Sequence, residues 1–185
     1  VRGEMLVQPT QGEAAFLGVM ATEIKEFIKR YPIETLRSGD VLISNDPWLG
    51  ASQLIDYTMV TPIFFRRQLV GFSGCCAHSA DVGGRVLSSD STDIHEEGFI
   101  IPPSFLYRRG RANDELFRFV RANVRVPDIV IGDFMAQVSS NELVKKRVLV
   151  FLEEMGLDDL EALGDQILIR SDEAVKSVIE KLREG

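Results

Sequence analysis

Hydrophobic residues recur at helical intervals near the start of the chain, over residues 12 to 30. The apolar positions that set this period are Phe16, Met20, Ile24, Phe27 and Ile28. Residues three or four apart share one face of a helix, so the pattern predicts an amphipathic helix. Thr10 and Glu13 have the spacing of a capping box, which supports a helix start at this point.

The last third of the chain is also helical in pattern. We expect a short helix after Asn113, a long one over residues 127 to 155 and a last one over residues 158 to 184. Pro127 suits the first turn of the long helix, and Gly156 suits its end.

Between these regions the pattern changes to that of strands. Residues 41 to 44 form a short apolar run, and two longer runs follow over residues 57 to 65 and 69 to 76. The longer runs are rich in β-branched and aromatic residues, and a polar interruption separates them, which predicts a β-hairpin. Pro62 indicates that its strand lies at a sheet edge or carries a bulge.

Residues 81 to 97 are rich in Gly, Ser and Asp and predict a long loop. Long ordered loops in compact domains are often functional. The order of elements favours a single α+β domain over residues 1 to 185, with a mixed or antiparallel sheet, a β-hairpin at its centre and a helical C-terminal third. Since the first residue is Val1, we expect the chain to be a fragment of a longer protein.

Composition excludes some partners. The net charge of -7 argues against nucleic acid and against an anionic membrane, because neither attracts an acidic surface. No apolar run has the length of a membrane-spanning helix, and the first residues have no signal-peptide pattern. The two cysteines, Cys75 and Cys76, are adjacent and fit a reducing, cytoplasmic compartment, where we expect them to be buried apolar groups.

Histidine is scarce, with only His78 and His95 in the chain. If the hairpin turn centres on Arg67, Asp56 and His78 are equally far from it and face each other across the two strands. Directly opposed residues share a face of the sheet, with Cβ atoms about 5 Å apart. A carboxylate and an imidazole so placed could share a divalent cation, or the carboxylate could orient the ring. A turn centred half a residue earlier, or a bulge at Pro62, would point them to opposite faces.

Simpler interpretations remain for each of these residues. His78 could be a hydrogen-bonded histidine at a strand end, and Asp56 an ordinary turn residue. Asp81 could be a further ligand or an acceptor behind the site, or it could only cap a turn. His95 has acidic neighbours and is expected on a solvated face.

Several segments resemble the hydantoinase B and oxoprolinase family. The run from Gly39 to Gly50, which contains Asn45-Asp46-Pro47, is similar to that family's most recognisable segment. Further matches follow in the same order over residues 60–64, 77–84, 96–103, 122–128, 132–133 and 136–137. The resemblance implies the N-terminal portion of a longer subunit.

The resemblance also implies an activity. Such a subunit works in a hetero-oligomer with a hydantoinase A-like ATPase, which uses ATP to phosphorylate the substrate. The B-type subunit then completes the hydrolysis of a cyclic amide, as in hydantoinases and 5-oxoprolinase. Two alternatives are an acetone- or acetophenone-type carboxylase subunit and a non-catalytic assembly subunit.

Metal-bearing members of this family hold a divalent ion, such as Mn²⁺ or Zn²⁺, through a His-x-x-Asp motif and a later histidine. By resemblance, these positions are Gln53, Asp56 and His78. Gln53 departs from the pattern, because an amide oxygen is a weaker ligand than imidazole for a first-row transition metal. Phe16 likewise occupies a position where the family has a histidine.

Overall fold

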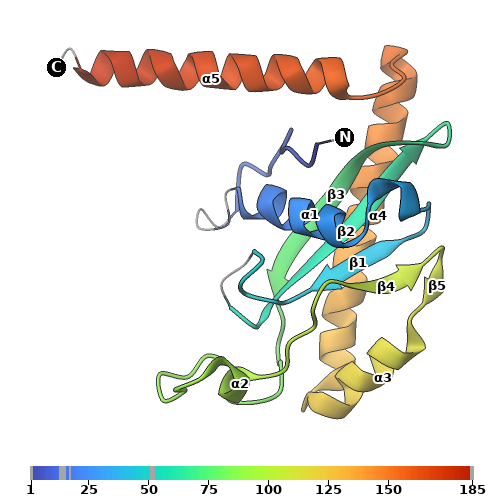
Figure 1. The fold of residues 1–185 in the computed structure, drawn as a ribbon, viewed down its shortest axis with the longest axis vertical. Helices are drawn as coiled ribbons and strands as arrows, with labels where there is room; N and C mark the ends of the chain where they lie inside the picture. The colour runs from blue at the N-terminus through green and yellow to red at the C-terminus, as the bar shows by residue number, and fades with distance from the viewer. Residues whose placement is uncertain (1, 13–15, 17, 51–52, 184–185) are drawn as a thin grey trace.

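The computed structural model describes residues 2–12, 16, 18–50 and 53–183 and has an α+β fold (Figure 1). Its five strands form one antiparallel sheet in the order β3-β2-β1-β4-β5. In chain order the elements are α1 (Val19–Arg30), a 3₁₀ turn η2 (Ile33–Thr35), β1 (Val41–Ser44), β2 (Asp56–Phe65), β3 (Gln68–His78), α2 (Ile94–Glu97), β4 (Ser104–Arg108), β5 (Arg111–Ala112), α3 (Asp114–Asn123), α4 (Pro127–Met155) and α5 (Glu161–Arg183).

Two helices cover opposite faces of the sheet. In Figure 1, α1 lies in front of the strands and α4 lies behind them. The core on the α1 side includes Ile24, Phe27, Leu42 and Val60. The core on the α4 side includes Ile43, Tyr57, Met59, Val130 and Phe134. Successive residues of a strand therefore pack into the cores on opposite faces of the sheet, because side chains alternate along a strand.

Helix α1 is shorter than its sequence pattern suggests. It begins at Val19 rather than near residue 12, because Gly18 adopts a left-handed conformation with φ of 81° at the N-cap. Residues 10 to 12 form a bend and not a helical turn. Glu13, the second half of the expected capping box, lies outside the described residues.

The C-terminal helices follow the sequence prediction more closely. Helix α4 starts at Pro127 and ends before Gly156, which is left-handed with φ of 64° and caps the helix. Helix α5 continues through Gly164 and extends away from the sheet (Figure 1). In the part of the chain that the structure describes, no helix is long and apolar enough to cross a membrane.

The predicted hairpin is present, with two corrections. It occupies an edge of the sheet rather than its centre, since β3 pairs only with β2. The turn is also tighter than expected: it centres between Arg66 and Arg67, which have positive φ of 48° and 73°. This turn conformation matches the twist of paired strands, and is usually made by Asn and Gly.

The shift at the turn is cancelled by a bulge. Phe64 pairs with Leu69 but Ile63 pairs with Gly71, so one extra residue of β3 is accommodated between these pairs. Beyond the bulge, Asp56 pairs with His78, as the sequence predicted. Either the shifted turn or the bulge alone would have pointed these side chains to opposite faces. Together, the two changes cancel.

Candidate functional site

Asp56 and His78 meet at the open end of the hairpin. His78 Nδ1 and Asp56 Oδ1 form a hydrogen bond. The Asp56 side chain is fully buried, whereas the His78 side chain is 55% exposed. The buried carboxylate therefore holds Nδ1 of the ring, and the exposed part of the ring remains accessible to a ligand.

The environment of Asp56 works in two directions. Burial raises the pKa of its carboxyl, while the hydrogen bond and charge of His78 and a hydrogen bond from the Gln53 main-chain N–H lower it. Oδ2 of Asp56 is buried and has no hydrogen-bond partner among the described residues. Only one of the two carboxylate oxygens is thus committed to the imidazole.

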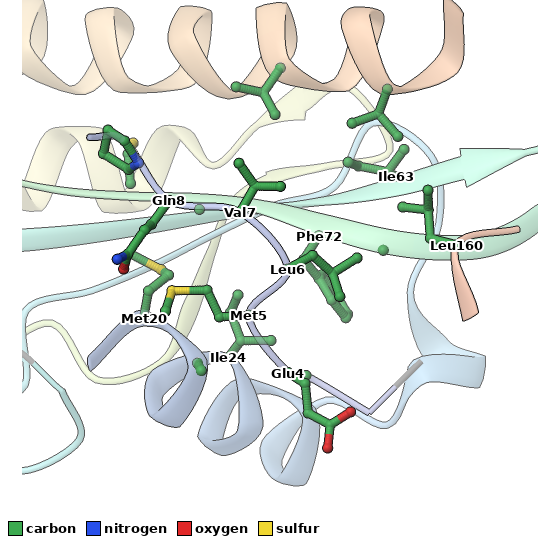
Figure 2. A pocket seen from close by; sticks show the side chains of 18 of the residues that line it. Glu4, Met5, Leu6, Val7, Gln8, Met20, Ile24, Ile63, Phe72 and Leu160 are labelled. Atoms are coloured by element: carbon green, nitrogen blue, oxygen red, sulfur yellow. The ribbon is translucent and has the colours of Figure 1, made fainter. Parts of the chain in front are cut away.

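A large cavity reaches this end of β3. It has a volume of about 1400 Å³ and is lined by the N-terminal segment, α1, β3, α4 and the start of α5. Figure 2 shows its apolar wall, with Leu6, Met20, Phe72 and Leu160 turned toward it. Cys76 and His78 also line it, so the exposed imidazole faces a space that is mainly apolar.

The Asn-Asp-Pro segment positions the approach to Asp56. The Asn45 amide donates to the carbonyls of Leu54 and Phe99, at 2.8 and 3.1 Å, and accepts from the Ile101 amide at 2.6 Å. Asn45 is itself buried. Its side chain thereby links the turn that leads into β2 to the loop that follows α2. This link positions Asp56 at the end of the sheet.

The structure brings two of the expected metal ligands, Asp56 and His78, into direct contact. Asp56 and His78 bond to each other, and the third expected ligand, Gln53, is half-buried and supplies its main-chain carbonyl to the Asp56 amide at 3.1 Å. Within the described ranges, no cluster of three His, Cys, Asp or Glu side chains could hold a metal ion, so an ion at Asp56 and His78 would need Gln53 or water as a further ligand. Phe16, which stands where the family pattern has a histidine, lines the cavity.

The remaining sequence candidates have structural roles. Asp81 accepts from the amides of Val82 and Gly83, at 2.9 and 3.1 Å, and pairs with the Arg125 guanidinium at 2.7 Å. It thus ties the glycine loop to the start of α4 and does not join the Asp56 site. His95 lies exposed on the short helix α2.

The adjacent cysteines face opposite sides of β3. Burial raises the pKa of Cys75 to about 11 and that of Cys76 to about 12. Both groups are therefore thiols at neutral pH, and neither is activated as a nucleophile. The raised pKa values agree with the expectation of unreactive groups, but both side chains are half-buried and not fully buried as expected.

Sequence reasoning missed one acid near the site, Glu23 of α1. It is only 2% exposed. Burial raises its pKa to about 7, and the negative charges of Asp46 and Asp56 act in the same direction. A signal was present, because Glu23 follows Met20 by three residues and precedes Phe27 by four, which places it on the apolar face of the helix.

The fold and the motif positions define a family. The pattern of the hydantoinase B/oxoprolinase family matches residues 1–185, and the chain belongs to that family.

Individual relatives agree with this assignment. A protein of Methanocaldococcus jannaschii is 36% identical over 183 residues, which cover 96% of this chain and 32% of that protein. The 5-oxoprolinase 1 of Arabidopsis thaliana is 28% identical over 90% of this chain and 14% of its own length. This chain therefore spans about a third or less of these relatives.

Two solved structures share the fold. The ATP-dependent caprolactamase from Pseudomonas jessenii matches with a TM-score of 0.80 and 26% identity, over 87% of this chain and 28% of that chain. A nucleotide-free acetone carboxylase matches with a TM-score of 0.68 over 80% of this chain and 20% of that chain. At 19% identity, the second likeness concerns the fold alone.

Proposed function

We propose that this chain is part of the B-type subunit of an ATP-dependent amidohydrolase that opens a cyclic amide. The contact between Asp56 and His78 carries the proposal, because it gives an oriented imidazole at the mouth of a large cavity. Family membership and the likeness to a caprolactamase support the choice of a cyclic amide. In this function a hydantoinase A-like ATPase partner uses the ATP, within a cytoplasmic hetero-oligomer.

The proposed chemistry is proton transfer by His78. Its Nδ1 is held by Asp56, so Nε2 accepts the proton of a water molecule that attacks the activated amide carbonyl. The water oxygen bonds to the carbon of the phosphorylated amide and the ring C–N bond breaks, which leaves an acyl phosphate. The proton on Nε2 then passes to the leaving nitrogen, and Asp56 stabilises the imidazolium in between. A second water hydrolyses the acyl phosphate and releases the carboxylate and inorganic phosphate.

The test requires the complete B-type subunit and its ATPase partner. His78→Gln should lower ATP-dependent ring opening by about 10²- to 10⁴-fold, the usual contribution of a positioned acid or base. Asp56→Asn should lower it as well, because the ring then loses its orienting charge. His95→Gln is the matched control, since it changes the other histidine of the chain and should leave turnover unchanged. Full turnover by His78→Gln would refute the proposal.

A carboxylase is the second candidate, because the resemblance in the motif segments also extends to acetone- and acetophenone-type carboxylase subunits. Products formed from ¹³C-labelled bicarbonate separate the two reactions. Label retained in a new carboxyl group indicates carboxylation, and an unlabelled amino acid product indicates hydrolysis.

A divalent metal, Mn²⁺ or Zn²⁺, is a further prediction for Gln53, Asp56 and His78. Bound there, it would act as a Lewis acid on the carbonyl oxygen. Metal analysis of the wild type and of Gln53→His tests it, with Gln68→His, on an exposed position of β3, as the control. If Gln53→His restores binding but not turnover, the chain serves as an assembly subunit. No gain in metal content would contradict the assigned ligand position.

A further inference from the structure

The two edges of the sheet differ in how they are protected. One edge is β5, which has two residues, both exposed, and begins with Arg111. The other edge is β3, which has 11 residues and contains no lysine, arginine, aspartate, glutamate or proline. An unpaired strand edge offers a row of main-chain donors and acceptors, and proteins usually protect it by short strands, charges, prolines or bulges. Apart from the bulge beside Val70, β3 has none of these features.

The side chains of β3 are also incompletely covered. In its neighbour β2, every residue but one is buried. In β3 only Val70 and Ser73 are buried, although α1 and α4 lie on the two faces of the sheet. Phe72 and Cys76 are apolar groups that remain half-buried. The missing cover is therefore on the side of β3 that faces away from β2.

The large cavity follows this open edge. Its lining includes most of β3, from Val70 to His78. Apolar side chains of other elements form its walls, namely Met20 and Ile24 from α1, Val144 and Phe151 from α4, and Leu160 before α5. Figure 2 shows Met20, Phe72 and Leu160 along it. A segment that lay beside β3 in this groove would contact apolar groups on both of its faces.

The relatives contain the chain length from which such a segment could come. The part matched by this chain is 32% of the Methanocaldococcus jannaschii protein and 28% of the caprolactamase chain. Most of each relative therefore lies outside the matched part, and it has to pack against the matched part somewhere. The uncharged edge and the apolar groove coincide, so they offer one place for that contact.

We propose that β3 pairs with a further strand, which belongs to the part of the same subunit outside these 185 residues. The strand runs alongside Val70–Cys76 and fills the groove there, while the exposed ring of His78 stays accessible at the end of β3. Because apolar walls cover both of its faces, its side chains are mainly apolar, as in other strands buried on both faces. This inference does not depend on the reaction proposed for His78.

Hydrogen exchange of the complete B-type subunit, followed by mass spectrometry, tests the pairing. About half of the amides of an edge strand bond to its one neighbour, and the others point to the open side. With a further strand in place, nearly all amides of residues 68–78 should exchange slowly. Arg111 and Ala112 at the other edge are the internal reference and should exchange fast. Fast exchange of about half of the β3 amides would overturn the proposal.

The same measurement identifies the source of the strand. Protection should be present in the B-type subunit alone and at every protein concentration. Protection that appears only after the ATPase partner is added would assign the strand to the partner and overturn the proposal. Protection that grows with concentration would assign it to a second copy of the chain, with the same consequence.

A charge placed in the groove is an independent test. A Cβ atom at Gly71 would lie 3.7 Å from Leu160 Cδ1, which is ordinary contact, so a side chain fits there while the groove is empty. In the complete subunit, Gly71→Lys should lower the melting temperature by several degrees, because the added strand would bury the charge. Ala112→Lys, at the exposed edge, is the matched control and should be neutral. An unchanged or higher melting temperature for Gly71→Lys would mean that the β3 edge faces water, and the proposal would be wrong.

Discussion

The two faces of the β2–β3 hairpin differ in how their polar groups are satisfied. On the α4 face, the Ser73 hydroxyl donates to Asn141 Oδ1 at 2.9 Å, and the Asn141 amide donates to the Met59 carbonyl at 3.0 Å. On the α1 face, Glu23 and Asp56 each keep a buried oxygen without a partner in the described part of the chain. Both faces are buried, but among the described residues the unpaired carboxyl oxygens lie on the α1 face.

Unpaired groups on the α4 face are of another kind. The Tyr57 hydroxyl and Gln137 Nε2 also have no partner among the described residues, but both are neutral at physiological pH. On the α1 face the unpaired groups include the acids Glu23 and Asp56, and Asp56 is hydrogen-bonded to the imidazole of His78 at a cavity. The comparison indicates that the α4 face buries mainly neutral groups, whereas the α1 face buries acids with unpaired oxygens, which costs stability.

The largest expected effect is on the α4 face. Phe134 is fully buried and its ring contacts that of Tyr57 with centroids 4.8 Å apart. Phe134→Ala should lower the free energy of unfolding by about 3–5 kcal/mol, because it leaves a cavity in the core. Urea unfolding measures this. The half-exposed Phe151 of the same helix is the control, and an equal loss in Phe151→Ala would show that the α4 face is not the main source of stability.

On the α1 face, Glu23→Gln should stabilise the protein at alkaline pH, whereas Phe134→Ala on the α4 face destabilises it. The native state holds the Glu23 proton up to about pH 7, whereas the unfolded chain releases it near pH 4.5. Wild-type stability should therefore fall as pH rises from about 4.5 to about 7, by about 3 kcal/mol from this residue. Glu23→Gln should lose this decline and be the more stable protein at pH 8.

Thermal unfolding at a series of pH values measures the Glu23 effect. Glu26→Gln should follow the wild-type curve, since that acid is paired with Lys29 near the surface. Parallel curves for the wild type and Glu23→Gln would mean that the buried acid is not protonated in the folded state.

Asn141→Ala should have a somewhat smaller effect. It removes both hydrogen bonds of a buried amide and leaves the Met59 carbonyl without its side-chain donor. A loss of about 1–3 kcal/mol is expected in denaturant unfolding. Ser140→Ala, one residue earlier and exposed, should be neutral. A neutral Asn141→Ala would remove the distinction between the two faces.

The smallest effect is expected at the closed end of the hairpin. Arg67 has a left-handed φ of 73°, which a side chain with a Cβ adopts at a cost. Arg67→Gly should stabilise the fold by about 0.5–1 kcal/mol, and Arg67→Ala should not. If both variants behave alike, the arginine side chain and not the backbone governs this turn.

Local signals predicted much of the fold. Helix α4 has the boundaries that Pro127 and Gly156 indicate, and the strands follow the runs of β-branched and aromatic residues. The opposed pair of Asp56 and His78 was also predicted, although through a turn centre that was wrong by half a residue. The bulge that restored the pairing depends on how β3 packs, which no local pattern encodes.

Helix α1 shows the reverse case. Its apolar period predicted the helix but placed its start too early. The left-handed Gly18 is the N-cap, so the helix begins only after it. The same period placed Glu23 on the buried face, but it could not say which groups meet it there. Only the approach of Gly50, Asp56 and Thr58 from distant segments makes that acid part of the site.

The sequence by itself determined the family, the hairpin and the two residues at its open end, because each depends on spacing along one or two neighbouring segments. The tertiary structure decided which carboxyls share a buried space and which face of the hairpin remains unsatisfied. The physical reason is that the cost of burying a charge depends on every group within a few ångströms, and those groups come from parts of the chain that are far apart in sequence.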